Sequence, residues 1–251
     1  MKKFALLALL PFAAACAFQP LSDAGNMELP ALEADDIVLE HSGYVSSYNA
    51  SARIPEWVAY ELTSEETEGS AERGDRMFKM DPSYKKTQAM REDYSGSNWT
   101  KGHMAPAADF RWDSDAMEET FYLTNVCPQS EALNTGDWEY LERQVRRWAK
   151  EYGNVWVVCG PVIGENRYGK IGQHKVVVPD AFFKAVMVHT GFGYSAIGFL
   201  MGNDSERYYL KDCALSINEL EDITGLDMYP ALDDSFEEKV EASYNLSVWF
   251  D

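Results

Sequence analysis

The sequence predicts an α+β fold, and three observations support this. Strand-like and helix-like segments are mixed along the 251 residues without the regular alternation that builds a parallel βαβ sheet. Residues 54–63 (IPEWVAYELT) alternate β-forming with polar side chains, the pattern of a half-buried strand. Residues 138–152 repeat apolar side chains at helical spacing. With 46% apolar residues, a chain of this length can bury a sizeable core.

The first residues are typical of a targeting segment. Lys2 and Lys3 precede an apolar stretch, residues 4–15, that is too short to span a bilayer. Small residues then lead to Cys16, which predicts a bacterial signal peptide over residues 1–15 and a lipid anchor on Cys16. A plain secretory signal cut near the same place is the alternative. We therefore expect export from a bacterial cell, as a membrane-anchored lipoprotein or as a periplasmic or extracellular protein.

Composition divides the rest of the chain. Residues 16–40 are polar and acidic and contain two prolines, which predicts a tether. Residues 41–251 are expected to form a single domain, in which residues 64–93 are loop-rich. Further strands are predicted at residues 121–125, 155–160, 175–179, 182–188 and 194–201.

The main predicted helix runs to about Tyr152 and has two distinct faces. Thr135 or Asp137 can cap its start, and Gly153 ends it. A second, shorter helix is predicted at residues 217–223. The core face of the main helix carries Trp138, Leu141, Val145 and Trp148, and another face carries the cations Arg143, Arg146, Arg147 and Lys150.

Charge is distributed unevenly along the chain. The formal net charge of −19 argues against a passive nucleic-acid coat, because phosphate affinity comes from cations. Residues 73–101, however, hold seven cations and four acids, and residues 143–150 hold four cations and no acid. A basic strip on an acidic body would bind a polyanion locally and release it easily.

The cysteines beyond Cys16 do not form a disulfide framework. Cys127, Cys159 and Cys213 are odd in number, and no pair has the spacing of a metal finger. Buried free thiols are the simpler interpretation.

One of the four histidines stands in an unusual setting. His103 follows Gly102 and Lys101 and precedes a turn of small residues, whereas His41, His174 and His189 have surroundings typical of structural histidines. An imidazole with an ordinary pKa near ~6.5 can accept a proton at neutral pH, so His103 is a candidate general base.

Two further residues are candidates for metal chemistry. Asn134 is either a turn residue or a metal ligand, since an amide oxygen is a hard neutral donor that suits Mg²⁺. Glu142 is either a solvated surface acid or a group that holds metal-bound water. The sequence contains no His-Glu-x-x-His, Walker or Gly-x-Ser-x-Gly motif.

An ordered set of motifs resembles a known family. Residues 101–109 (KGHMAPAAD) closely resemble the active-site motif of the DNA/RNA non-specific endonucleases, which include secreted bacterial nucleases and mitochondrial endonuclease G. This resemblance implies a ββα-metal fold, with a central antiparallel or mixed sheet flanked by helices. Further matching stretches are residues 57–63, 76–82, 123–129, 133–142, 159–161 and 219–226.

The resemblance also implies an activity and a site. The chain would hydrolyse DNA and RNA with Mg²⁺ or Mn²⁺ and leave 5′-phosphate products. His103 would be the general base, Asn134 the sole direct protein ligand of the metal, and Glu142 would orient metal-bound water. Arg76 and Lys101 would grip the phosphate. Supporting or substrate-contacting residues would be Asn125, Gln129, Arg143, Arg146 and Arg147.

The sequence departs from the family in one place. The usual Asp-Arg before Gly-His is Thr100-Lys101 here, and lysine keeps the charge but loses the bidentate fork that matches a phosphate. Two rival functions follow: a catalytically silent nucleic-acid-binding lipoprotein, and a hydrolase of smaller phosphodiesters.

Overall fold

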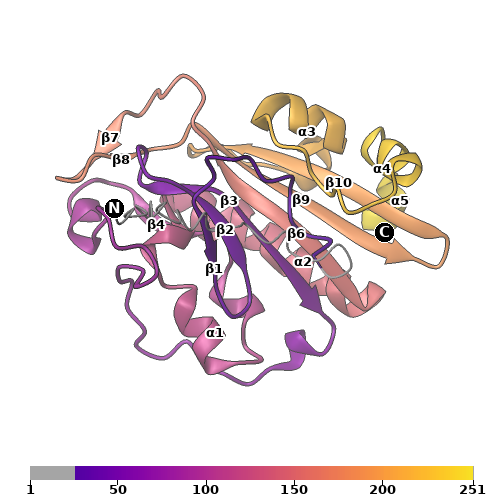
Figure 1. The fold of residues 1–251 in the computed structure, drawn as a ribbon, viewed down its shortest axis with the longest axis horizontal. Helices are drawn as coiled ribbons and strands as arrows, with labels where there is room; N and C mark the ends of the chain where they lie inside the picture. The colour runs from indigo at the N-terminus through magenta and orange to yellow at the C-terminus, as the bar shows by residue number, and fades with distance from the viewer. Residues whose placement is uncertain (1–25, 251) are drawn as a thin grey trace, which may run out of the picture.

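A seven-stranded antiparallel sheet forms the centre of the molecule (Figure 1). The structure is a computed structural model that describes residues 26–250. It confirms the α+β prediction. In sheet order the strands are β1 (Val38–Glu40), β2 (Val45–Asn49), β3 (Ile54–Thr63), β6 (Asn154–Val162), β9 (Ala181–Thr190), β10 (Gly193–Gly202) and β11 (Ala214–Leu215).

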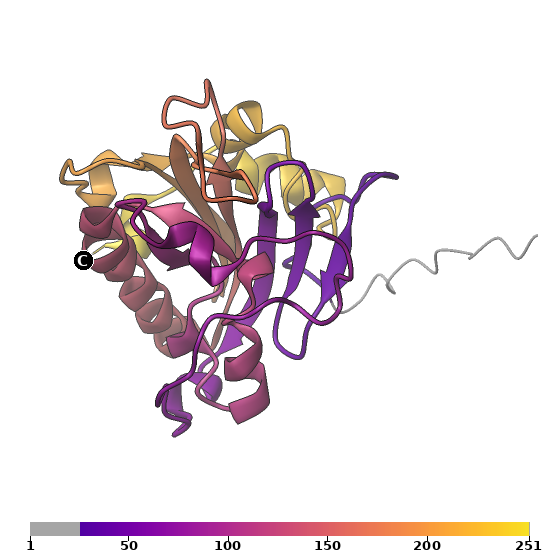
Figure 2. The same cartoon turned by 90° about the vertical axis from the view of Figure 1, so that its left-hand side faces the viewer.

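Helices cover both faces of this sheet. In the turned view of Figure 2 the sheet stands between α2 (Trp138–Tyr152) on one side and the pair α3 (Ile217–Thr224) and α4 (Asp234–Glu241) on the other. The two larger hydrophobic clusters lie one on each face. The other helical elements are α1 (Ser114–Glu119), α5 (Leu246–Trp249), the 3-10 turns η1 (Glu66–Glu68), η2 (Arg91–Tyr94), η3 (Ala107–Asp109), η4 (Leu123–Asn125) and η6 (Leu210–Asp212), and the π-helical turn η5 (Leu133–Asp137).

A small hairpin lies over the α2 side of the sheet. Its strands β4 (Thr100–His103) and β5 (Val126–Gln129) pair antiparallel, and β5 leads into η5 and α2. This is the ββα unit that the resemblance implied. A second hairpin, β7 (Lys170–Ile171) with β8 (Val176–Val177), lies at the same end of the molecule as β4 (Figure 1).

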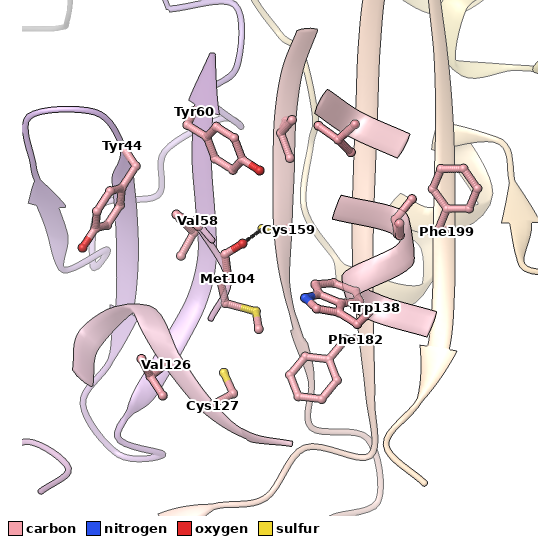
Figure 3. Close-up of a cluster of buried hydrophobic side chains, with 14 of the residues drawn as sticks. Tyr44, Val58, Tyr60, Met104, Val126, Cys127, Trp138, Cys159, Phe182 and Phe199 are labelled. Carbon is pink, nitrogen blue, oxygen red and sulfur yellow. Dashed lines mark hydrogen bonds between the residues drawn. The ribbon is translucent and has the colours of Figure 1, made fainter. Parts of the chain in front are cut away.

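The larger core cluster joins the hairpin to the main sheet and to α2. Figure 3 shows Met104 and Cys127 beside Val58 and Cys159, with Trp138 against Phe182. The predicted apolar face of α2 is buried in this cluster, and each such side chain contributes roughly 1.5–3 kcal/mol by leaving water. Cys127, Cys159 and Cys213 are free thiols; the first two are fully buried and the third is half-buried.

The ends of α2 have different geometries. Gly153 ends the helix as expected, with a φ of 93° that an L side chain rarely adopts. At the start, η5 carries a kink at Gly136 (φ −115°, ψ −105°), and no side chain caps the helix. The expected cap by Thr135 or Asp137 is therefore absent, because Asp137 accepts a hydrogen bond from the Tyr208 amide instead.

Two predicted strands differ from those observed. Residues 121–125 were expected to be a strand, but Leu123–Asn125 form the turn η4 and the strand begins at Val126. The Asn125 side chain bonds backbone groups around it and so favours a turn. Of residues 175–179 only Val176 and Val177 pair with another strand.

Part of the expected tether is packed against the domain. Strand β1 pairs with β2 at the edge of the main sheet, and Leu29 is buried in the cluster beneath α3 and α4. Residues 26–40 therefore belong to the folded body rather than to a free spacer. The predicted signal peptide, residues 1–15, and the lipidation site Cys16 lie outside the described residues. None of the helices in residues 26–250 has both the length and the hydropathy that crossing a membrane requires.

Candidate active site

An open pocket of about 860 Å³ lies where β4, η5 and α2 meet. It brings together side chains that the sequence analysis chose from separate segments: His103 and Lys101 from β4, Asn134 from η5, and Glu142 and Arg146 from α2. The ββα unit produces this convergence, because β4 runs beside β5 and β5 leads directly into η5.

His103 stands between two aromatic rings on one wall of this pocket. Its ring centroid lies 4.9 Å from that of Phe78 and 5.1 Å from that of Phe121. Burial, and then the nearby Arg73 charge, lower the pKa of His103 to about 3, so the imidazole is neutral at pH 7. Its Nε2 atom is buried without a hydrogen-bond partner in residues 26–250. A neutral imidazole with an unused nitrogen can accept a proton.

The arginine beside His103 is Arg73 rather than Arg76. Arg73 lines the pocket and places its Cζ 5.2 Å from the centroid of the Phe121 ring. Arg76 lines a neighbouring hollow, where its Nε lies 3.1 Å from Glu118 Oε2 and its Nη2 donates to Ser114 Oγ at 2.7 Å. The structure therefore does not bring Arg76 into the pocket, because Glu118 and Ser114 hold it outside.

Lys101 extends along aromatic rings toward the pocket. Its Nζ lies 5.0 Å from the centroid of Tyr94 and 5.7 Å from that of Phe78. Burial, followed by repulsion from Arg91, lowers the Lys101 pKa from its ordinary value. The ammonium group of Lys101 is a second positive charge in the pocket and could pair with a negatively charged phosphate.

Thr100 orients the Asn134 side chain. The Thr100 hydroxyl donates to the Gln129 carbonyl oxygen at 2.8 Å and accepts from Asn134 Nδ2 at 2.9 Å. Because the amide nitrogen is engaged there, the amide oxygen is the atom left for a cation. Thr100 stands where the family usually has an aspartate, and its hydroxyl orients the Asn134 side chain.

Glu142 lies in a group of four ionisable side chains. The others are Asp109, Arg146 and Lys184, and Lys184 is fully buried with its Nζ 4.7 Å from the centroid of the Trp138 ring. Burial raises the pKa of Glu142 to about 8, while the positive charges of Lys184 and Arg146 favour its ionised form. Because this pKa lies above 7, Glu142 is largely protonated at neutral pH, which lowers the cost of burying it beside Asp109.

Arg146 is an internal partner and not a surface cation. Its Nη1 donates to Asp109 Oδ1 at 2.6 Å, and Tyr60 donates to the other carboxylate oxygen at 2.8 Å. The predicted cationic face of α2 is therefore divided: Arg146 faces inward, whereas Arg143 and Arg147 are exposed. Arg143 pairs with Glu139 one turn earlier on the helix.

Asn125 and Gln129 hold the hairpin behind the pocket. Asn125 accepts from the Ala105 amide and donates to the Ala105 carbonyl, both at 2.9 Å, and so fixes the turn after His103. Gln129 is buried and fills the space beside Gly102, where an added Cβ would lie 2.0 Å from Gln129 Oε1. Only glycine fits at position 102 without a shift.

The oxygen donors of the pocket suit a hard divalent cation. The Asn134 amide and the Glu142 carboxylate both line it. Within residues 26–250 there is no group of three or more His, Cys, Asp or Glu side chains that could hold a metal ion. A metal here would therefore keep most of its waters, which fits Mg²⁺ better than a tightly caged metal.

A second hollow of similar volume has the wrong charge for phosphate. It measures about 870 Å³ and lies on the opposite side of β3 from α2, between β2 and the end of α3. Its acids would repel a polyanion: Glu33, Asp35, Asp36, Glu56 and Asp227.

Sequence reasoning missed Arg73, Asp109 and Lys184. Arg73 and Asp109 lie within or next to the stretches that were singled out, so their charge was a usable signal. Lys184 lies in an apolar strand, and a lone lysine there gives no sign that it is buried.

The fold and the pocket together define a protein of the ββα-metal nuclease class. A search of family models matches residues 24–235 to the DNA/RNA non-specific endonucleases. The mitochondrial nuclease EXOG of Xenopus laevis is 36% identical over 209 residues, which cover 77% of this chain and 58% of that protein. Human mitochondrial endonuclease G is 36% identical over 160 residues, covering 60% of this chain and 54% of that protein.

A solved structure gives the same result. The chain superposes on endonuclease G in the crystal structure of the EndoG/EndoGI complex with a TM-score of 0.78 and 29% identity, covering 87% of this chain and 96% of that one. The chain belongs to the DNA/RNA non-specific endonuclease family. It spans a little over half the length of the EXOG and endonuclease G proteins that it matches.

The relatives correct the predicted localisation. EXOG and endonuclease G, and also nuclease 1 of Schizosaccharomyces pombe, are mitochondrial by name. The prediction of export from a bacterial cell is therefore wrong. The comparisons give no support to a lipid anchor or to secretion either.

Proposed function

We propose that this protein is a metal-dependent endonuclease that hydrolyses both DNA and RNA without sequence preference. Membership of the family supports the reaction class. The observation that carries the proposal is the meeting of His103, Asn134 and Glu142 in one pocket beside two cations, Arg73 and Lys101.

His103 is the proposed general base. The imidazole takes a proton from a water that attacks the phosphorus in line with the 3′ oxygen. The low pKa in the free protein keeps the imidazole neutral. A bound phosphate offsets the Arg73 charge that helps to lower this pKa, so substrate binding makes His103 a stronger base at the time that it is needed.

Arg73 and Lys101 are the proposed phosphate-binding cations. Negative charge accumulates on the phosphoryl oxygens as the water attacks, and two fixed cations in a partly dry pocket stabilise that charge. Arg73 takes the role that the sequence analysis gave to Arg76. Its planar guanidinium also restores part of the bidentate recognition that Lys101 lacks.

Asn134 is the proposed protein ligand of Mg²⁺ or Mn²⁺, and Glu142 accepts hydrogen bonds from water on that side of the pocket. The cation supplies Lewis-acid stabilisation of the phosphate and of the leaving 3′ oxygen when it is bound. The bond from phosphorus to the 3′ oxygen breaks, a water protonates that oxygen, and the products carry a 3′ hydroxyl and a 5′ phosphate. The proposed contacts reach the backbone and no base edge, which explains acceptance of DNA and RNA alike.

Incubation of plasmid DNA and total RNA with the full chain, in Mg²⁺, Mn²⁺ or EDTA, tests the proposal. We expect metal-dependent loss of both substrates, and we expect His103→Ala to reduce the rate by ~10²–10⁴-fold. Full activity of His103→Ala would mean that His103 is not the general base. Binding of DNA without cleavage under either metal would favour the rival, a silent nucleic-acid-binding protein. Cleavage of a chromogenic diester that long DNA does not inhibit would favour a smaller substrate.

A further inference from the structure

Two aromatic side chains from different segments meet at the rim of the active-site pocket. Trp99 directly precedes β4 and lines the pocket together with Lys101 and His103. Tyr168 comes from the turn before β7 and is 37% exposed. Their ring centroids lie 5.0 Å apart at 61°, an edge-on contact.

Hydrogen-bonded turns carry both aromatic residues. The Trp99 amide donates to Ser97 Oγ at 3.2 Å, and that hydroxyl donates to the Tyr94 carbonyl at 2.8 Å. Tyr168 sits in a tight turn, in which the Gly169 amide donates to the Asn166 carbonyl at 3.2 Å. Both residues therefore stand on hydrogen-bonded turns, and their rings contact each other.

A second contact ties the same two segments together. His174 Nδ1 lies 2.9 Å from Asp93 Oδ2, which fastens the β7–β8 hairpin to the residues before Trp99. Partly exposed aromatic side chains beside a cation are the usual elements of a site for single-stranded nucleic acid.

We propose that Trp99 and Tyr168 form an aromatic rim that binds one nucleobase of the substrate by stacking, next to the phosphodiester held at His103. This inference rests on the proposed function. Stacking uses the face that every base has, so the rim adds affinity without sequence preference. A base must leave its helical stack to reach the rim, so single strands should bind better than duplexes.

Binding measured in EDTA separates the rim from the chemistry. We would titrate fluorescein-labelled dT12, and a 12-mer of abasic sugars with the same phosphates, against wild type, Trp99→Ala, Trp99→Phe and Tyr168→Ala. Phe192→Ala is the matched control, because Phe192 is a fully exposed aromatic in the β9–β10 turn, at the other end of the molecule from β4 (Figure 1). Circular dichroism would check that each variant is folded.

We expect Trp99→Ala to weaken dT12 binding by ~5- to 100-fold and to leave abasic binding within about twofold. Tyr168→Ala should show a smaller loss of the same kind, while Trp99→Phe and Phe192→Ala stay near wild type. An equal loss on both ligands would overturn the proposal, since Trp99 would then act only by shaping the pocket around Lys101. No loss on either ligand would also overturn it. Failure of the wild type to cleave in metal would instead count against the proposed function alone.

Discussion

The hydroxyl of Thr100 shows how a single residue can replace another with different chemistry. The family usually places an aspartate there, and its absence suggested a weakened site. In the structure the hydroxyl still reaches Asn134, because it donates to the Gln129 carbonyl and keeps a lone pair for the amide. The departure changes the charge at this position without releasing the residue proposed to bind the metal.

Thr100→Val should therefore weaken metal binding. Valine has the same shape but cannot accept the Asn134 hydrogen bond, and loss of such a supporting contact typically lowers metal affinity or activity ~10–100-fold. We expect the Mg²⁺ concentration for half-maximal rate to rise, and Thr100→Ser to stay near wild type. Mn²⁺ titration by electron paramagnetic resonance provides a readout independent of turnover. Equal metal affinity in all three proteins would assign Thr100 to packing only.

Glu142 predicts a pH dependence of stability. Its pKa is raised to about 8 in the folded chain, against an ordinary value of 4.5, so the folded state binds a proton that the unfolded state has lost between these values. The free energy of unfolding in EDTA should fall as pH rises from 4.5 to 8. Glu142→Gln removes the titrating group. The free energy of unfolding of this variant, relative to that of the wild type, should rise by roughly 1 kcal/mol or more between pH 4.5 and pH 8.

Urea denaturation of both proteins at pH 5 and pH 8 tests this expectation. A difference between the two proteins that stays constant with pH would mean that Lys184 and Arg146 keep Glu142 ionised throughout.

At the scale of elements, α2 has two kinds of arginine that its sequence does not distinguish. Arg143 and Arg146 are both on the face away from the apolar stripe, yet only Arg146 reaches the buried Asp109. Helical periodicity places a side chain on a face, but it does not show what lies opposite that face. For the same reason the sequence predicted β3 and the end of α2 closely, whereas η5 and its kink depend on contacts with distant segments such as Tyr208.

Matched substitutions on α2 should separate these arginines. Arg146→Met leaves a fully buried carboxylate without its cation, which we expect to destabilise the fold by ~3–5 kcal/mol. Arg143→Met breaks an exposed pair with Glu139 and should change stability by at most ~1 kcal/mol. Guanidinium denaturation midpoints measure both. Similar losses in the two variants would contradict an internal role for Arg146.

At the scale of the whole molecule, a net charge of −19 would limit how the proposed nuclease holds nucleic acid. Five acids and no cation line the hollow on the other side of the sheet, whereas four cations and three acids line the pocket. The sequence predicted this polarity from its charge runs. It could not predict which arginine lines the pocket. Arg73 and Arg76 lie three residues apart in an irregular loop, and only tertiary contacts direct their side chains to different places.

This polarity predicts a shallow salt dependence of DNA binding. Each phosphate contact contributes about one unit to the slope of log affinity against log salt. Arg73→Gln should reduce that slope by ~1, whereas Arg76→Gln should leave it unchanged. Fluorescence anisotropy in EDTA from 50 to 300 mM KCl, with both variants at equal protein concentration, would measure it. A reduced slope for Arg76→Gln alone would mean that Arg76, as the sequence analysis expected, contacts the phosphate and Arg73 does not.

The β9–β10 turn offers a practical use. Phe192 at its tip is fully exposed, and Figure 1 places this turn at the opposite end of the molecule from β4. Among residues 26–250 the native thiols are poorly reactive: two are fully buried, and the pKa of Cys213 is raised to about 11 by burial and nearby acids. A Phe192→Cys substitution would add an accessible thiol at this turn for coupling to a resin or an electrode. Protein attached there would keep the pocket side away from the support, and the proposed activity could then be used and removed together with the support.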